Sequence, residues 1–385
     1  MHILHVARSD RSAGLTAYGV NDLTFWLRTS GFESTIVWLL AGGERANGLA
    51  AERGREVGLT KGQALLGSRC EDLDDLVALA DIVHVHGLSQ VPCVPAIASA
   101  RWLGKPVVCS PHGYLISRFL GPPRSVLRYF SRSLALRAAR QVSGFHFASQ
   151  MEFEVSRPIL STRVPGFVQP FALSPSFYER LPELEIAELL APAIRRDGPW
   201  VLSLATAEVG SGIYAVLVGA FETVLSRFPR AQLIFVGDDS VRFAQKIQGL
   251  RTSCGDAGSV HFLPTIAGAS LLSLYRRADV LVATGAVEGI DRVAVEVVAC
   301  ETPVVLTPDV AVHKEIMASG AGCIADPTSW SIGESILRVL SDEPRRRQLG
   351  IFGRRWVLER LDPGLTVGKL RDFYAEMLKL KAAVD

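Results

Sequence analysis

Residues 287–305 read Val-Glu-Gly-Ile-Asp-Arg-Val-Ala-Val-Glu-Val-Val-Ala-Cys-Glu-Thr-Pro-Val-Val, and apolar runs occupy 280–283 and 304–306. Each run has the length and composition of a buried strand. Residues 291–300 between them predict a helix that ends before a Thr-Pro pair. A strand, a helix and a second strand in this order form the unit of a parallel α/β sheet.

Two carboxylates flank the start of the predicted helix. Glu288 follows the carboxyl end of the first strand, and Glu296 lies in the second helical turn. Open α/β sheets bind ligands at this edge, beside helix N-termini whose free N–H groups attract anions. The arrangement predicts a ligand with hydroxyls on both sides of a phosphate, such as a nucleotide sugar.

The two glutamates, eight positions apart and followed by Ala-Cys-x-Thr-Pro-Val-Val, resemble the signature of retaining GT-B glycosyltransferases of the large family-4 group. The resemblance implies that Glu288 faces the donor sugar and that Glu296 holds the nucleotide ribose. Gly289, next to Glu288, falls in the same predicted donor site. The implied fold class is α/β, GT-B, with two doubly wound, Rossmann-like parallel-sheet domains facing a cleft.

The pattern along the chain agrees with this fold class, because strand-length apolar runs alternate with helical stretches in both halves. Predicted strands are 3–7, 35–40, 82–86, 106–110, 144–148, 200–205, 232–236, 260–263, 280–283 and 304–307, and predicted helices include 16–29, 92–103, 212–228, 242–254, 269–277 and 367–380. Residues 165–199 contain six prolines and predict a linker. We therefore expect an acceptor-binding domain at 1–170 with the C-terminal helix 365–385, and a donor-binding domain at 190–364.

Composition narrows the class of protein. A length of 385 residues exceeds a single core and favours two domains. The net charge of +2 indicates no general polyanion binding, so no nucleic acid is expected as a partner. The six cysteines show no CxxC spacing, and the chain shows no signal-peptide pattern and no apolar run of about 18 residues. These features predict a cytoplasmic enzyme.

The first half carries further candidate ligand contacts. The family has a glycine-rich loop after the first strand, where this chain keeps only Gly14, and Arg8 and Arg11 either supply charge there or are solvated. His86 and His112 each precede a glycine at the carboxyl end of a predicted strand. The resemblance implies that His112 approaches the donor sugar and that both segments line the cleft.

Residues 121–141 combine basic and apolar side chains. Arg124, Arg128 and Arg132 are four apart and form a stripe on one face of a predicted helix. Two interpretations remain open. The helix either contacts the anionic inner membrane as a peripheral anchor near a lipid-linked acceptor, or it is a packed domain helix with a solvated face.

The second half departs from the family where the resemblance implies basic contacts to the donor diphosphate. Family members have Gly-Arg and then Lys-Gly after the first strand of this domain. Here Thr206 replaces the arginine, Gly210, Ser211 and Gly212 cover the lysine, and no Lys or Arg lies between residues 196 and 227. Further on, residues 309–312 replace the family's glycines.

Three explanations compete for this departure. The turn at 210–212 offers backbone N–H groups to phosphate, or Arg292 reaches the diphosphate from the helix start, or turnover has been lost. Asp291 complicates the second explanation, since aspartate there is a natural N-cap that would repel phosphate.

The resulting prediction is a retaining hexosyltransferase-type glycosyltransferase that uses a UDP- or GDP-sugar and a glycan or lipid-linked acceptor. Glu288 and His112 are the predicted catalytic residues, and Glu296, Arg292, Gly289, Gly210, Ser211, Gly212 and Gly14 are the predicted donor-binding residues. No cofactor and no metal are expected, and Gly237-Asp238-Asp239 is interpreted as a turn after a strand. The rivals are a non-catalytic GT-B partner or regulator of another transferase, and a GT-B sugar-nucleotide epimerase.

Overall fold

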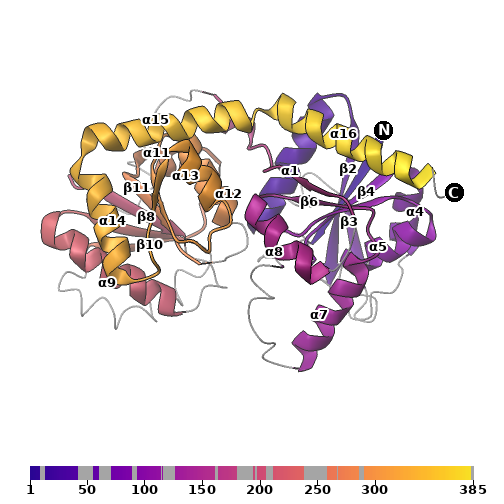
Figure 1. Ribbon diagram of the computed structural model, residues 1–385, viewed down its shortest axis with the longest axis horizontal. Coiled ribbons are helices and arrows are strands. Elements are labelled where there is room, and N and C mark those ends of the chain that lie inside the picture. Colours follow the sequence, from indigo (N-terminus) through magenta and orange to yellow (C-terminus); the bar gives the residue numbers. More distant parts are fainter. Residues whose placement is uncertain are drawn as a thin grey trace. The chain divides into compact units, whose positions relative to one another are not determined.

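The structure, a computed structural model, describes residues 1–8, 14–41, 55–59, 71–88, 93–113, 115, 126–160, 164–179, 194–195, 197–204, 211–237, 258–266, 268–285 and 290–382. The chain divides into two compact units (Figure 1). The first combines Met1–Leu173 with Leu361–Asp385, and the second is Ser174–Arg360. Acceptor binding by the first and donor binding by the second remain predictions.

The first unit is built on a parallel sheet of seven strands in the order β3-β2-β1-β4-β5-β6-β7. The strands are β1 (His2–Arg8), β2 (Glu33–Ala41), β3 (Arg55–Leu59), β4 (Ile82–His86), β5 (Val107–Ser110), β6 (Gly144–Phe147) and β7 (Gly166–Val168). Its helices are α1 (Gly14–Thr29), α4 (Glu71–Leu79), α5 (Cys93–Trp102), α7 (Val126–Ala139), α8 (Gln150–Leu160) and α16 (Pro363–Ala382).

Helices cover both faces of this sheet, as the continuous apolar strands predict. On one face Leu4 and Val85 pack against helices α4, α5 and α7. On the other face Ile3 and Ile82 pack against α1 and α16, which lie next to each other (Figure 1). The second face changes from apolar to polar toward the carboxyl ends of the strands, where His5, His84 and His86 follow at alternate positions.

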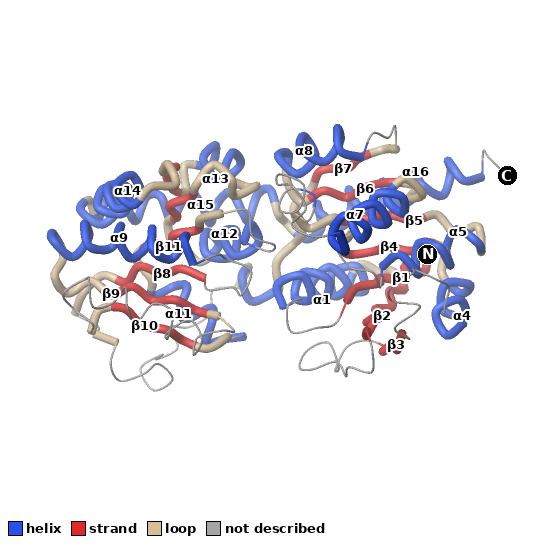
Figure 2. Tube along the Cα trace, turned by 90° about the horizontal axis from the view of Figure 1, so that it is seen from below, coloured by secondary structure: helices blue, strands red, loops and turns tan. Residues whose placement is uncertain are grey.

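The second unit has a parallel sheet of six strands in the order β10-β9-β8-β11-β12-β13. Its strands are β8 (Trp200–Leu204), β9 (Gln232–Val236), β10 (Val260–Leu263), β11 (Val280–Ala283), β12 (Val304–Leu306) and β13 (Gly322–Ile324). Its helices are η1 (Pro175–Phe177), α9 (Ser211–Arg227), α11 (Gly268–Arg277), α12 (Ile290–Ala299), α13 (His313–Ser319), α14 (Ser329–Ser341) and α15 (Glu343–Arg360). Helices α9 and α14 pack together on one face of the sheet (Figure 2).

The two-sheet α/β architecture confirms the predicted fold class, with two corrections to the predicted elements. Strands β3, β7 and β13 were not predicted, because they are short edge strands whose apolar residues show no clear periodicity. The predicted linker is wrong at its start, since β7 pairs with β6 as the seventh strand of the first sheet. The predicted helix 242–254 lies outside the described residues.

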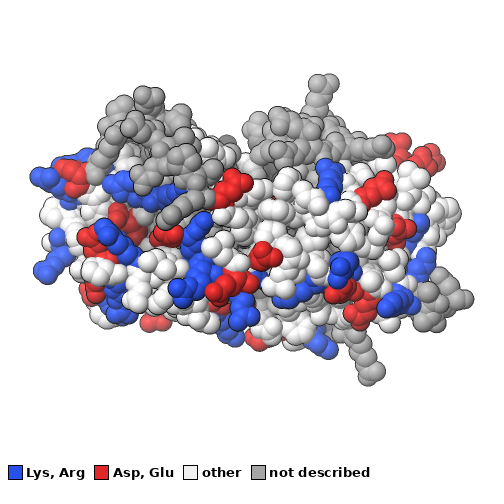
Figure 3. Space-filling model, turned by 90° about the horizontal axis from the view of Figure 1, so that it is seen from above, with Lys and Arg blue, Asp and Glu red and all other residues white. Residues whose placement is uncertain are grey.

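On the face drawn in Figure 3, acidic and basic side chains are interspersed, in keeping with the small net charge. Among the described helices, none is both long and apolar enough to cross a membrane.

Candidate functional site

The predicted donor site of the second unit centres on α12. This helix begins at Ile290 behind the carboxyl end of β11, as the sequence predicts. Glu288 and Gly289 lie outside the described residues, so their contacts remain predictions. Glu296 lies in the second turn and is buried.

Arg292 and Tyr275 both donate hydrogen bonds to the Glu296 carboxylate. Arg292 Nε donates to Glu296 Oε1 at 2.8 Å, and the two side chains are only 12% and 7% exposed. Tyr275 of α11 donates its hydroxyl to Oε2 at 3.4 Å. Burial and the neighbouring Glu296 charge raise the pKa of Tyr275 well above 10, so that it remains an O–H donor. A carboxylate has about four acceptor positions and can accept from several donors at once.

Asp291 does not cap the helix, and the prediction that it is an N-cap is wrong. It lies inside α12, and its carboxyl accepts hydrogen bonds from the backbone N–H groups of Ala311 and of Val312, the latter at 3.2 Å. Burial is the main cause that raises its pKa to about 7. Asp291 thus joins α12 to the loop before α13, and it carries less negative charge at neutral pH than an ordinary aspartate.

Asp309 braces the same loop, a role that sequence reasoning missed. It accepts a hydrogen bond from the hydroxyl of Thr307 and another, at 3.3 Å, from the N–H of Gly285. The N–H of Gly285 also lies 3.2 Å from Thr307 Oγ1. The carboxyl ends of β11 and β12 are therefore tied together, although this loop lacks the glycines of the family pattern.

The glycine-rich positions are described in part. Ser211 and Gly212 begin α9 after β8, whereas Thr206 and Gly210 lie outside the described residues. Gly14 is the first residue of α1. Helices thus start at both predicted glycine-containing turns, and their contacts to phosphate remain predictions.

In the first unit a strained turn presents His112 directly after β5. His112 has a φ of 52° and Gly113 a φ of 79°, so a non-glycine residue occupies the left-handed region. Glu152 of α8, 2% exposed, accepts hydrogen bonds from the N–H of Gly113 at 2.5 Å and from the N–H of Ala148 at 2.8 Å. This buried carboxylate holds the turn, and such strain is typical of ligand-binding positions.

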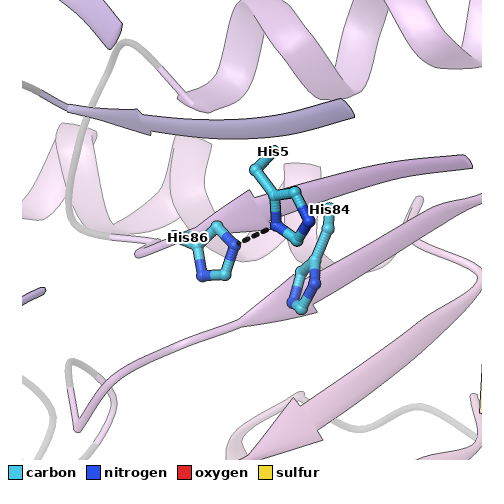
Figure 4. Close-up of side chains that lie close together, drawn as sticks. All are labelled: His5, His84 and His86. Carbon is cyan, nitrogen blue, oxygen red and sulfur yellow. Dashed lines mark hydrogen bonds between the residues drawn. The ribbon is translucent and has the colours of Figure 1, made fainter. Parts of the chain in front are cut away.

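His112 ends a chain of hydrogen-bonded imidazoles. His5 Nδ1 lies 3.0 Å from His86 Nε2 (Figure 4), and His86 Nδ1 lies 3.1 Å from His112 Nε2. The chain runs from β1 through the neighbouring β4 to the loop after β5. Phe171 stacks on the His112 ring at 5.0 Å between centroids. The structure therefore brings the two predicted histidines together.

Two further histidines lie beside this chain. His84 contacts Tyr374 Oη at 2.6 Å and Ser110 Oγ at 2.8 Å, and His146 Nε2 donates to the carbonyl of Gln169 at 2.7 Å. Burial lowers the pKa of His5 to about 3 and of His146 to about 4, and lowers the pKa values of His84 and His86 well below 6.5. These four histidines are therefore neutral imidazoles at neutral pH.

The cluster could have been found from the sequence only in part. His5, His84 and His146 escaped prediction, although His84 and His86 alternate along one strand and face the same side. Their assembly depends on the order β1-β4-β5-β6, and Phe171 reaches it from the segment after β7.

The cluster also contains the only described group with spacing near that of a metal site. His5, His84 and His86 each offer a ring nitrogen within 4.8 Å of the others. Both nitrogens of His84 already hydrogen-bond to Tyr374 and Ser110, and His5 Nδ1 is engaged by His86. Metal binding would require these contacts to be given up, so the cluster is better explained as a hydrogen-bond network.

Residues 202–356 match the family model described as glycosyl transferases group 1. The matched segment lies within the second unit. The chain is also similar to D-inositol 3-phosphate glycosyltransferase of Actinosynnema mirum, with 39% identity over 97 residues, and of Salinispora tropica, with 32% identity over 130 residues. The matched stretches cover 23% and 33% of this chain, and 23% and 26% of the two relatives.

Solved structures resemble the whole chain. Sucrose-phosphate synthase from Thermosynechococcus elongatus has a TM-score of 0.74 at 15% identity, covering 99% of this chain and all (100%) of that one. Anabaena Alr3699/HepE, in complex with UDP and glucose, has a TM-score of 0.75 at 16% identity, covering 98% and 100%. At such identities the likeness concerns the fold, which is GT-B. The segment that matches the glycosyl transferases group 1 model includes α12 with Glu296, Arg292 and Asp291.

Proposed function

We propose that this protein is a glycosyltransferase that moves a sugar from a nucleoside diphosphate, UDP or GDP, to an acceptor hydroxyl with retention of anomeric configuration. The observation that carries the proposal is the buried Glu296 carboxylate, held by Arg292 in the second turn of α12 within the family-matched segment. Similarity to D-inositol 3-phosphate glycosyltransferases supports sugar transfer. The fold shared with Alr3699/HepE, which binds UDP, supports a UDP-sugar as the donor.

Glu296 suits the ribose of the donor nucleotide. A ribose presents two neighbouring hydroxyl donors, and a carboxylate whose orientation is fixed by a cation and a phenol is a suitable acceptor for them. Arg292 keeps the carboxylate oriented, and its guanidinium lies near the start of a helix whose N-terminus favours anions. We therefore propose that the ribose binds at the second turn of α12 and the diphosphate toward its first turn.

The residues assigned to the diphosphate and sugar are the backbone of 210–212 and the pair Glu288 and His112. Glycine-rich turns before helices offer N–H groups to phosphate oxygens, which compensates for the absent lysine and arginine. Glu288 and His112 orient sugar hydroxyls. His112 is suited to this role because its turn is held rigidly by Glu152.

In the proposed step the bond between the anomeric carbon and the diphosphate oxygen breaks, and a bond to the acceptor oxygen forms on the same face. The acceptor proton passes to the departing phosphate oxygen, so no protein nucleophile is needed. The acceptor we propose is a glycan or lipid-linked hydroxyl. A lipid carrier would place the protein at the inner membrane surface, with residues 121–141 as the contact.

The decisive experiment is isothermal titration calorimetry with UDP, GDP and ADP on the wild type, Glu296→Gln and Glu301→Gln. Glu301 follows α12 and pairs with Arg354 at its exposed carboxylate, which makes it a matched control. We expect one diphosphate to bind, and Glu296→Gln to weaken it at least about tenfold through the loss of a charged hydrogen bond. Glu301→Gln should bind like the wild type.

Two outcomes would contradict the proposal. Absence of binding for all three nucleotides would favour a non-catalytic partner or regulator of another transferase. Conversion of a bound nucleotide sugar to its epimer, without acceptor, would favour an epimerase.

A further inference from the structure

The His5–His86–His112 chain has a property that follows from proton counting. A neutral imidazole carries one N–H, and each nitrogen–nitrogen contact needs one nitrogen to donate and the other to accept. The distances of 3.0 and 3.1 Å are those of hydrogen bonds. The direction of one bond therefore fixes the direction of the other, and only two proton arrangements make both bonds.

The buried end of the chain distinguishes the two arrangements. His5 is fully buried, and its Nε2 has no hydrogen-bond partner among the described residues. If His112 donates toward His86, then His5 carries its proton on Nε2 and buries an N–H without an acceptor. If His5 donates toward His86, the same atom is only a bare lone pair. Orphaned buried N–H groups are the rarer of the two, which favours the second arrangement.

The exposed end of the chain then has a defined proton position. His86 donates from Nδ1 to His112 Nε2, so the single proton of a neutral His112 lies on Nδ1. In this arrangement Nε2 of His112 is the acceptor that faces His86, and Nδ1 is the donor nitrogen of the ring.

We propose that His5 and His86 are positioning residues that fix His112 in the Nδ1–H tautomer, so that it donates a hydrogen bond to a hydroxyl of the donor sugar. This inference rests on the proposed function. Because the hydrogen-bonded histidine chain ends at the buried His5 ring, it fixes the tautomer of His112 and does not transfer a proton to solvent. His5 thus acts two residues removed from the sugar.

The tautomer is measurable without substrate by ¹⁵N NMR of protein labelled at histidine, because protonated and unprotonated ring nitrogens have separate shifts. His112 signals are assigned by their loss in His112→Gln. His146 is an internal reference of the opposite kind, since its Nε2–H donates to the Gln169 carbonyl. We expect Nδ1–H for His112 and Nε2–H for His146.

The variants separate the chain from general packing. His5→Phe keeps a ring and removes the donor, and it should shift His112 toward Nε2–H. His5→Asn places an amide donor near the former Nδ1 and should restore Nδ1–H, which also covers failure of the phenylalanine variant to fold. His146→Phe, outside the chain, should leave His112 unchanged. Nε2–H on His112 in the wild type, or an unchanged tautomer in His5→Phe, would overturn the inference.

Enzyme kinetics test whether the His112 tautomer affects turnover of the sugar donor. With UDP-glucose and GDP-mannose as probes, His5→Phe should lower kcat/KM for donor turnover about tenfold, the effect of one lost hydrogen bond, with UDP affinity unchanged. Full turnover in His5→Phe would refute the role of the chain. Failure of the wild type to bind nucleotide would instead refute the proposed function, while the NMR result would still settle the tautomer.

Discussion

Arg292 and Glu296 form an ion pair one helical turn apart, with Nε 2.8 Å from Oε1 and both side chains mostly buried. The pair lies in the segment that the sequence singles out for the donor nucleotide. Because Arg292 is hydrogen-bonded to Glu296, the residue predicted to bind the ribose, it orients that carboxylate as well as lying near the predicted diphosphate position. Two experiments separate these roles.

The first compares ligands. We expect Arg292→Ala to weaken UDP or GDP binding more than binding of the matching nucleoside, because the guanidinium neutralises phosphate charge as well as orienting Glu296. Calorimetry with each nucleotide and nucleoside gives the two ratios. If both affinities fall equally, Arg292 acts only through Glu296, and the diphosphate relies on the backbone at 210–212.

The second measures the ion pair itself. Removing one partner of a buried pair leaves an uncompensated charge, so Arg292→Met should lower the free energy of unfolding by about 3 kcal/mol. The double variant Arg292→Met with Glu296→Gln should be closer to the wild type than the sum of the single variants. Urea unfolding of the four proteins checks this. Additive losses would mean that the pair contributes nothing to stability.

Glu152 is predicted to set the geometry of His112. Its carboxylate accepts the N–H groups of Gly113 and Ala148, and Glu152→Gln replaces one acceptor oxygen with a donor. The expected loss is about 2 kcal/mol of unfolding free energy, typical of hydrogen bonds to a charged group, together with a loss of donor turnover. Glu154→Gln, exposed on the same helix, is the control and should match the wild type. If the two variants have the same unfolding free energy and the same donor turnover, Glu152 does not set the geometry of His112.

The sequence alone predicted five strands of each sheet. The strands at 232–236, 260–263 and 280–283 match β9, β10 and β11 because each is a continuous apolar run between clear helix patterns. Short edge strands such as β7 carry too few residues for a period to be recognised, and only pairing with β6 identifies them.

Candidate site residues divide in the same way. The place of Glu296 in the second turn of α12 could be predicted because it depends on a single helix, and its binding of ribose remains a prediction. The histidine cluster depends on strand order, and Tyr374 of α16 joins it from 290 residues further along the chain than His84. Such contacts have no local signature. The capping role predicted for Asp291 was wrong for a similar reason, since its partners are Ala311 and Val312 in a distant loop.

The membrane contact remains a prediction for α7. Arg124 and the side chains of Arg128 and Arg132 lie outside the described residues, while Leu136 near the helix end packs against the first core. We expect the triple change of these arginines to glutamate to abolish sedimentation with anionic vesicles, each arginine contributing about 1 kcal/mol at such a surface. Changing the exposed Arg137 and Arg140 at the other end of the helix to glutamate is the control. Equal vesicle binding by the wild type and triple variant would favour a packed helix with a solvated face.

Asp291 predicts a pH dependence of stability whose sign follows from its pKa. Burial raises that pKa from 3.8 to about 7, so between these values the folded protein binds more protons than the unfolded chain. The contribution of Asp291 is therefore fully present below pH 3.8 and is lost as the pH rises through 7. Asp291→Asn mimics the protonated group and keeps an oxygen for the N–H of Val312. Its stability relative to the wild type should increase from pH 4 to pH 8 by at most about 4 kcal/mol, at about 1.4 kcal/mol per pKa unit.

Urea unfolding at several pH values, with the exposed Asp326→Asn as control, tests this directly. The control should follow the wild type at every pH, because Asp326 lies at the surface. A difference between Asp291→Asn and the wild type that does not change with pH would show that Asp291 is ionised in the folded protein. In that case its negative charge would persist at the helix start, and Arg292 would have to offset it before any diphosphate could bind there.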